Sequence, residues 1–240
     1  MRVGLFSDVH GNATAFDALL DDLERCPVDR LVCLGDAIQG GPQPVECLER
    51  LRGLDCRIVM GNADWYVLTG DPGAEPETEN QRRAREWTLS QLSAADQDFV
   101  RSFAPTVAEP PVLAFHGSPG SFDDVILPST PEEEFRRVLD GHDAPILAGG
   151  HTHQQFLRRR GASTFLNPGS VGLSYDDTLP DDAVRFDPWA AWAVVEADGG
   201  GVSIEFRRAP FDPEKVAEAI EASGLPSKER AAGWRSEPSK

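Results

Sequence analysis

Residues 3–12 read VGLFSDVHGN, a short apolar run that ends in an aspartate and a histidine two positions apart. Each apolar run of this kind is short enough to be a buried strand. Sites in open α/β sheets form outside the carboxyl ends of the strands, so we expect such turns to converge in one crevice. Four later turns share the pattern: Gly35-Asp36 after 31–34, Gly61-Asn62 after 58–60, His116-Gly117 after 112–115, and residues 149–153, GGHTH, after 146–148.

The chain between these turns alternates strand and helix patterns. Apolar residues at helical spacing predict helices over 14–25 and 44–52, between strands at 3–6, 31–34 and 57–60. Continuous apolar strands between helices are typical of an α/β fold whose sheet is covered on both faces. Further along we expect strands at 112–115, 145–148, 156–158 and 164–166, a helix capped by Thr130 and Glu133 that ends near Leu139, a hairpin of 189–196 with 202–207, and a closing helix at 213–222.

Residues 64–103 interrupt the strand pattern. A stretch rich in Gly, Pro and acidic residues, 70–79, precedes two predicted helices, and Ser93 and Asp96 form a capping box for the second. Because the segment lies between Asn62 and His116, we expect it at the rim of the site as a lid or specificity element. The sequence thus predicts one domain over 1–222, with 64–103 as a helical lid insertion, and a polar, loosely held tail over 223–240.

Composition narrows the function classes. The chain has 240 residues, 26% of them charged, and a net charge of −17. This acidity argues against general nucleic-acid binding but not against a phosphate substrate, because bound divalent ions set the local sign of the field. No apolar stretch approaches the ~20 residues that span a bilayer, so no membrane partner is expected. Met1-Arg2 leads directly into the first strand, and we expect a cytoplasmic protein.

The five turns carry seven side chains of metal-ligand type. One ion needs about four to six ligands, so seven indicate two ions that share a carboxylate. Nitrogen and oxygen ligands without cysteine favour Mn²⁺, with Fe, Zn²⁺, Co²⁺ or Ni²⁺ as alternatives, over Ca²⁺. Two such ions ~3.5–4 Å apart can clamp a phosphoryl group and deprotonate a bridging water. The seven are Asp8, His10, Asp36, Asn62, His116, His151 and His153.

The order and spacing of these motifs, Asp8-x-His10, Gly35-Asp36, Gly61-Asn62, His116-Gly117 and residues 150–153, resemble the calcineurin-like metallophosphoesterases over most of the chain. The turn 167–172, NPGSVG, is similar to one in the compact bacterial phosphodiesterase and phosphatase branch. The resemblance implies a four-layer α-β-β-α sandwich. It further implies that Asp8, His10 and His153 hold the first metal, that Asp36 bridges, and that Asn62, His116 and His151 hold the second.

The activity that the resemblance implies is hydrolysis of phosphodiester or phosphomonoester bonds by a metal-bridging hydroxide, with Asp36, Asn62 and His116 as catalytic residues. Ala63 departs from the family pattern, because a histidine thought to protonate the leaving oxygen usually stands there. Loss of a general acid costs ~10²–10⁴-fold, and substrates with acidic leaving groups should suffer least. A dinucleoside polyphosphate hydrolase, a protein phosphatase and, in another class, a non-catalytic protein-binding scaffold remain as alternatives. Retention of all seven ligands argues against the scaffold.

The expected substrate is a small phosphate ester or a nucleotide. Asn12, Asn62 and Arg82 are candidate substrate-binding residues, although Asn12 is equally suited to cap a helix and Arg82 to lie on a solvated helix face. Trp189 and Trp192 lie on a predicted strand, where core packing or a subunit interface in a homo-oligomer would explain them.

Overall fold

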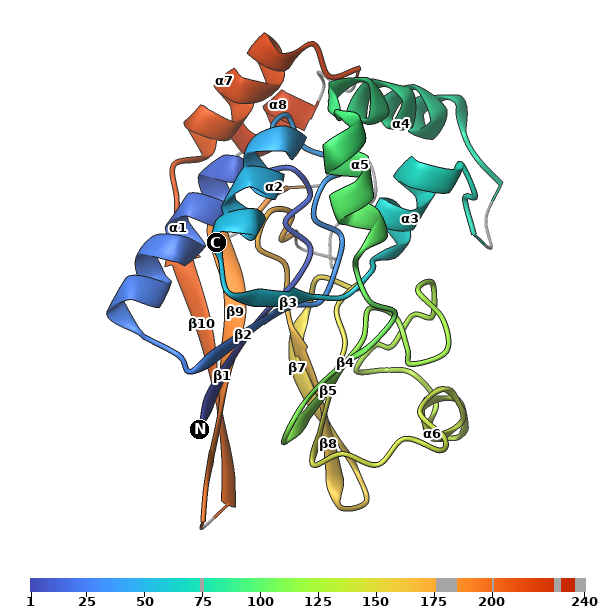
Figure 1. Ribbon diagram of the computed structural model, residues 1–240, viewed down its shortest axis with the longest axis vertical. Coiled ribbons are helices and arrows are strands. Elements are labelled where there is room, and N and C mark those ends of the chain that lie inside the picture. The colour runs from blue at the N-terminus through green and yellow to red at the C-terminus, as the bar shows by residue number, and fades with distance from the viewer. Residues whose placement is uncertain (74–75, 176–184, 200, 227–229, 236–240) are drawn as a thin grey trace.

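The computed structural model describes residues 1–73, 76–175, 185–199, 201–226 and 230–235. Two five-stranded mixed sheets face one another at its centre (Figure 1). In spatial order, the first sheet contains β10 (Gly201–Pro210), β9 (Trp189–Asp198), β1 (Arg2–Phe6), β2 (Arg30–Cys33) and β3 (Cys56–Ile58). The second contains β4 (Val107–Glu109), β5 (Val112–Ala114), β6 (Ile146–Ala148), β8 (Ser163–Pro168) and β7 (Gln155–Arg160).

Both sheets combine parallel and antiparallel strands: the antiparallel pairings lie on one side of the first sheet and at both edges of the second. In the first sheet β1, β2 and β3 are parallel, while β9 runs antiparallel to β1 and forms the predicted hairpin with β10. In the second sheet β5, β6 and β8 are parallel, with β4 and β7 antiparallel at the edges. The sequence pattern did not predict β4. The carboxyl ends of β1 and β8, one from each sheet, lie together, because the Val171 amide after β8 donates to the carbonyl of Ser7 after β1 at 2.9 Å.

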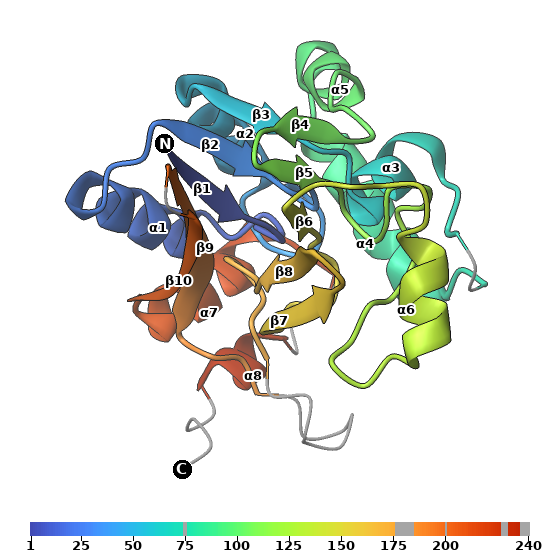
Figure 2. The ribbon, with the colours of Figure 1, turned by 90° about the horizontal axis from the view of Figure 1, so that it is seen from below.

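Side chains alternate between the two faces of the first sheet and so form two cores. Val3 and Val32 belong to the core between the sheets, whereas Phe6 and Leu31 belong to the core under the helices. The core under the helices also contains Phe16 of α1 (Ala13–Arg25), and α2 (Pro44–Gly53) contributes to it as well. These two helices therefore cover the outer face of the first sheet (Figure 2).

The fourth layer lies on the outer face of the second sheet, where α6 (Glu132–Val138) packs through Phe135 (Figure 2). The predicted α/β four-layer arrangement is therefore confirmed. The predicted cap of α6 is wrong: the helix begins after Pro131 without a side-chain cap, and Thr130 Oγ1 accepts a hydrogen bond from the Leu127 amide instead.

Three helices, rather than the predicted two, occupy the insertion after β3. They are α3 (Asn62–Thr69), α4 (Glu79–Gln91) and α5 (Ala94–Arg101). The capping box of Ser93 and Asp96 is confirmed, and Thr78 with Gln81 forms a second one that begins α4. The sequence missed α3 because its eight residues carry no side-chain cap and follow directly from the Gly61 turn.

The C-terminal part of the chain is more ordered than its polar composition predicted. After α7 (Pro213–Ser223), residues 230–235 form α8, and Trp234 is buried against Phe186 and Phe211. Apolar contact with a single tryptophan thus anchors a segment that we expected to be loosely held. The remainder of the predicted tail, 227–229 and 236–240, lies outside the described residues.

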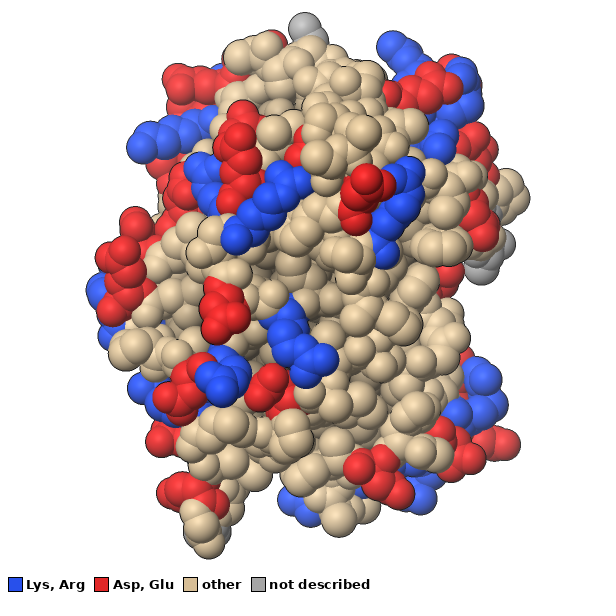
Figure 3. Space-filling model, in the orientation of Figure 1, with Lys and Arg blue, Asp and Glu red and all other residues tan. Residues whose placement is uncertain are grey.

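The described surface agrees with the composition. On the face in Figure 3, basic and acidic side chains are interspersed, without an extended basic stripe. None of the helices in the described ranges is long and apolar enough to cross a bilayer. Trp192 is fully buried, so core packing explains it.

Candidate metal centre

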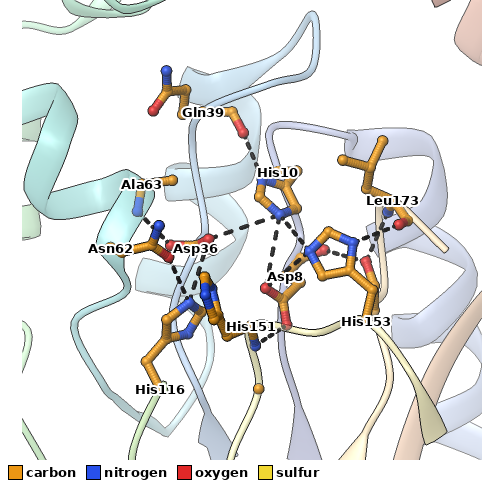
Figure 4. Close-up of polar contacts among 12 residues, drawn as sticks. Asp8, His10, Asp36, Gln39, Asn62, Ala63, His116, His151, His153 and Leu173 are labelled. Atoms are coloured by element: carbon orange, nitrogen blue, oxygen red, sulfur yellow. Dashed lines mark hydrogen bonds and ion pairs between the residues drawn. The ribbon is translucent and has the colours of Figure 1, made fainter. Parts of the chain in front are cut away.

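The structure brings the seven predicted ligands together where the carboxyl ends of the two sheets meet (Figure 4). Asp8, His10 and His153 place one ligand atom each within 4.8 Å of one another, and Asp36, His116 and His151 form a second group of the same kind. The first group contains the three residues that the resemblance assigns to the first metal, and the second contains His116 and His151, assigned to the second metal, together with Asp36.

Asp36 and Asn62 complete this arrangement. Oδ2 of Asp36 lies 3.8 Å from His10 Nε2 in the first group and 3.4 Å from His116 Nε2 in the second. The carboxylate therefore lies between the groups, as a bridging ligand must. Asn62, the first residue of α3, places its Oδ1 2.9 Å from His116 Nε2.

Five of the seven predicted ligands have left-handed backbone conformations, with φ between 49° and 69°. They are also all of the non-glycine residues with positive φ in the described ranges: Asp8, His10, Asp36, His151 and His153. Such conformations cost of order 1 kcal/mol or more for residues with a side chain, and they persist where surrounding structure enforces them, mostly at functional sites.

Backbone hydrogen bonds between the turns enforce these conformations. The Asp8 amide donates to Gly35 O, and the His10 amide donates to Asp36 O, both at 2.9 Å. From the other sheet, the turn 167–172 contributes two bonds to the Asp8 carbonyl, from Ser170 Oγ at 2.8 Å and from the Gly172 amide at 2.9 Å. This turn therefore helps to orient Asp8, one of the predicted ligands.

The Gly61 turn requires glycine because it approaches Asp36 closely. A Cβ on residue 61 would lie 2.0 Å from Asp36 Oδ1 and 2.3 Å from the Asp36 amide nitrogen, well inside ordinary van der Waals contact. Ala63, two residues later, uses the same proximity, since its amide donates to Asp36 Oδ1 at 2.8 Å.

Three of the histidines have a fixed tautomer. Nδ1 of each lies 2.7 Å from a backbone carbonyl, which can only accept, so in the neutral ring Nδ1 carries the proton and Nε2 presents a lone pair to the centre. The donor and acceptor pairs are His10 with Gln39 O, His116 with Leu34 O, and His153 with Leu173 O.

The unprotonated nitrogens and carboxylate oxygens face one another in a way that suits a cation. His10 Nε2 and His153 Nε2 lie 3.0 Å apart, so when both rings are neutral with Nδ1 protonated their lone pairs face each other and repel unless a cation or a proton lies between them. Asp8 Oδ1 is buried without a hydrogen-bond donor and lies 3.3 Å from His153 Nε2. The donor set therefore fits a divalent ion at each group.

The electrostatics of the second group lead to the same conclusion. Burial alone would lower the pKa of His116, but the neighbouring carboxylates Asp36 and Asp8 raise it to about 10. Conversely, although burial raises it, the pKa of Asp36 is held well below its ordinary value by His116 and His10. Both pKa shifts arise because carboxylates and imidazoles lie close together in a buried site, where a bound cation would neutralise the negative charge of the carboxylates.

Asp64 is a supporting residue to which the sequence assigned no contact. Its Oδ1 accepts hydrogen bonds from the Ala37 and Ile38 amides at 2.9 and 3.2 Å, and so fixes the loop that carries Asp36. Full burial, followed by repulsion from Asp36, raises the pKa of Asp64 to about 7. The sequence showed only that an acidic residue stands two positions after Asn62. A single aspartate at such a position cannot be distinguished, from sequence, from one on the surface.

The predicted substrate-binding residues have different outcomes. Asn62 lies in the centre. Asn12 is buried, and both ends of its amide are used: Oδ1 accepts from the Ala15 amide to cap α1, and Nδ2 donates to Gly172 O. The structure does not bring Arg82 to the centre, because it forms ion pairs with Glu79 and Glu86 on its own helix.

A pocket of about 250 Å³ adjoins the first group at His10. Its walls come from the loop after β2, from the insertion and from the C-terminal region. The described lining residues are His10, Gln39, Gly40, Ala63, Asn80, Gln81, Ala84, Leu173, Leu225 and Arg230. The predicted lid segment thus contributes α4, through residues other than Arg82.

Comparison with known proteins agrees with this geometry. Residues 1–186 match the model described as the calcineurin-like phosphoesterase superfamily domain. An uncharacterized protein of Methanocaldococcus jannaschii is 25% identical over 239 residues, which cover 93% of each chain. A symmetrical bis(5'-nucleosyl)-tetraphosphatase of Paracidovorax citrulli is 33% identical over 101 residues, 41% of this chain and 34% of that protein.

Two solved structures are similar over nearly the whole chain. A metallophosphoesterase from Sphaerobacter thermophilus has a TM-score of 0.77 and 26% identity, covering 98% of this chain and 99% of that one. A hypothetical protein from Pyrococcus horikoshii OT3 has a TM-score of 0.79 and 18% identity, covering 95% of each chain, and shares the fold.

Proposed function

Since this chain belongs to the calcineurin-like phosphoesterase superfamily, we propose that it is a hydrolase of phosphodiester or phosphomonoester bonds that works with two divalent metal ions. The observation that carries the proposal is the pair of ligand groups with Asp36 between them. A bridging carboxylate between two sets of inward-facing imidazoles is the arrangement that a two-ion centre requires.

Two ions held in these groups would supply Lewis acidity toward the phosphoryl oxygens and lower the pKa of water. The residues of the chain supply the geometry. The carbonyls of Gln39, Leu34 and Leu173 hold His10, His116 and His153 so that Nε2 faces inward. Such outer partners fix ring orientation and raise ligand basicity.

Asn62 and His116 contact each other beside Asp36, on the side of the centre next to Ala63. We propose that the Asn62 side chain orients a phosphoryl oxygen, because its amide has a donor group besides the Oδ1 that faces His116. Ala63 cannot donate a proton, so departure of the leaving group depends on its own acidity or on solvent. The favoured substrates are therefore esters with acidic leaving groups.

We propose Mn²⁺ as the preferred ion, since imidazole and carboxylate oxygen without thiolate suit it, and Fe, Zn²⁺, Co²⁺ or Ni²⁺ as substitutes. We propose a small phosphate ester or a nucleotide as the substrate, with the pocket of about 250 Å³ beside His10 as the place for the part beyond the scissile phosphate. A dinucleoside polyphosphate is the second candidate substrate, because the similarity to a tetraphosphatase over 101 residues favours it.

The test is metal content together with hydrolysis of bis-p-nitrophenyl phosphate after reconstitution with Mn²⁺. We expect two ions per chain and turnover that chelation abolishes. Asp36→Asn should lower both the metal content and kcat/KM, the latter by at least ~10²-fold, because even partners of metal ligands contribute 10–100-fold.

Asp98→Asn is the matched control, because Asp98 is an exposed aspartate paired with Arg101 on α5. This variant should behave as the wild type. A wild-type protein that binds no metal, or that binds it without hydrolysing any phosphate ester, would contradict the proposal and favour a scaffold. Full turnover in Asp36→Asn would refute the bridging role.

A further inference from the structure

The pocket beside His10 has one wall from outside the residues that match the family model. Leu225 and Arg230 line it, and Arg230 is the first residue of α8. Asn80, Gln81 and Ala84 of α4 line the same pocket, so the insertion and the C-terminal helix both border it. The family model ends at residue 186, well before either side chain.

Arg230 brings a permanent positive charge close to a predicted metal ligand. Its Nη1 donates to Gly40 O at 2.8 Å. A Cβ on Gly40 would lie 3.3 Å from that Nη1 and 3.5 Å from His10 Nδ1. The Arg230 guanidinium and the His10 imidazole therefore both lie next to Gly40. Gly40 has a φ of 115°, and the absence of a side chain there leaves room for the guanidinium.

The rest of the lining is suited to an anion. Besides Arg230 and His10, the described residues of the pocket wall carry amides, at Gln39, Asn80 and Gln81, and apolar groups, with no carboxylate. In a chain of net charge −17, a wall of this composition is distinct from the general surface. A guanidinium presents five N–H donors in a planar fork, which matches phosphate and carboxylate geometry.

We propose that Arg230 binds a second anionic group of the substrate, a phosphate or a carboxylate, while the scissile phosphate lies at the metal centre. This inference rests on the proposed function and narrows it to esters or anhydrides that carry two anionic groups. The selectivity then depends on the C-terminal helix rather than on the seven ligands.

The test compares three substrates in the wild type and two variants. ADP and 2-phosphoglycolate each carry a second anion, respectively a phosphate and a carboxylate, while bis-p-nitrophenyl phosphate carries none. Arg230→Gln removes the charge and keeps a donor for Gly40 O. Arg235→Gln is the control, because Arg235 lies on the same helix but pairs with Glu214 and Glu221 away from the pocket.

We expect Arg230→Gln to lower kcat/KM about 10- to 100-fold for the preferred dianionic substrate, as loss of a charge-assisted hydrogen bond does, and less than about 3-fold for bis-p-nitrophenyl phosphate. If kcat/KM falls more for ADP, the anion that Arg230 binds is a phosphate; if it falls more for phosphoglycolate, the anion is a carboxylate. Arg235→Gln should affect all three substrates equally. Equal losses for all substrates in Arg230→Gln, or no loss, would overturn the proposal.

A binding measurement separates this inference from the proposed function. Calorimetric titration of the Mn²⁺-loaded protein with methylenediphosphonate, which resists hydrolysis, needs no turnover. Arg230→Gln should weaken its binding about 10-fold or more relative to Arg235→Gln. If no substrate is hydrolysed but this difference is found, the proposed function fails and the anion site remains. Equal affinities in the two variants refute the anion site even where hydrolysis is found.

Discussion

Replacement of Gly61 by alanine should disrupt the metal centre through a single methyl group. The added Cβ would lie 2.0 Å from Asp36 Oδ1 and 2.8 Å from its Cγ, whereas ordinary contacts begin at 3.4 Å. The φ of Gly61 is −91°, which alanine adopts freely, so the effect isolates steric contact from backbone strain.

The displacement needed exceeds 1 Å, as the difference between these distances shows. Asp36 cannot yield easily, because its carbonyl accepts from the His10 amide and its Oδ1 accepts from the Ala63 amide. Overpacking of this kind costs about 1–3 kcal/mol of stability. A misplacement of about 1 Å at a catalytic group costs on the order of 10²-fold in rate. We therefore expect a folded protein with less than full metal content and a ~10²-fold lower kcat/KM.

The assay combines metal analysis, kcat/KM for bis-p-nitrophenyl phosphate and the free energy of unfolding in urea. Gly53→Ala is the control, because Gly53 is the last residue of α2 and its added Cβ meets nothing within 4 Å. That variant should keep both ions and full activity, and alanine should stabilise the helix by up to about 1 kcal/mol. Two bound ions and unchanged kcat/KM in Gly61→Ala would refute the reasoning.

Three further predictions concern other parts of the chain. Ala63→His should raise kcat most for poor leaving groups, by at most ~10²–10⁴-fold, so a plot of log kcat against leaving-group pKa should be less steep than in the wild type; identical slopes would exclude acid catalysis from this position. Ala84→Phe should narrow the pocket wall on α4 and raise KM for nucleotides while metal content stays unchanged, and a fall in metal content instead would contradict a role in substrate choice. Asp22→Asn should cost about 1.5–3 kcal/mol at pH 7, since Asp22 accepts from Arg207 and Trp192. Because Arg207 holds the pKa of Asp22 below its ordinary 3.8, this difference in unfolding free energy should persist above pH ~4 and vanish as the pH falls further; a difference that does not change with pH would contradict it.

The sequence located the seven predicted ligands because each follows a short apolar run. Parallel strands are recognisable as such runs, and their carboxyl ends meet at one edge, so position along the chain indicates position in space. The helices with strong patterns were predictable for a related reason: α1 and α7 repeat apolar residues at helical spacing, and Ser93 caps α5. In all of these the signal lies within one element.

The features that the sequence did not predict depend on contacts between distant segments. Asp64 supports the Asp36 loop through amides that lie 27 and 26 residues earlier, and Arg230 reaches Gly40 across 190 residues. Arg82 is the converse case: of the two roles left open by the sequence, the structure places it on a helix face, paired with Glu79 and Glu86. Which face of α4 meets the pocket depends on tertiary packing, which the spacing of its charged residues does not encode.

The left-handed ligands show how much of the centre is a property of the fold. Five residues at about 1 kcal/mol or more each amount to roughly 5 kcal/mol of local strain, comparable with the whole stability of a small domain. Local preference would relax these turns, but backbone hydrogen bonds such as Asp8 to Gly35 and Gly172 to Asp8 hold them. These bonds join turns from both sheets, so the packing of one sheet on the other offsets the strain. The packing that makes the two sheets face each other therefore also positions the turns that carry the ligands.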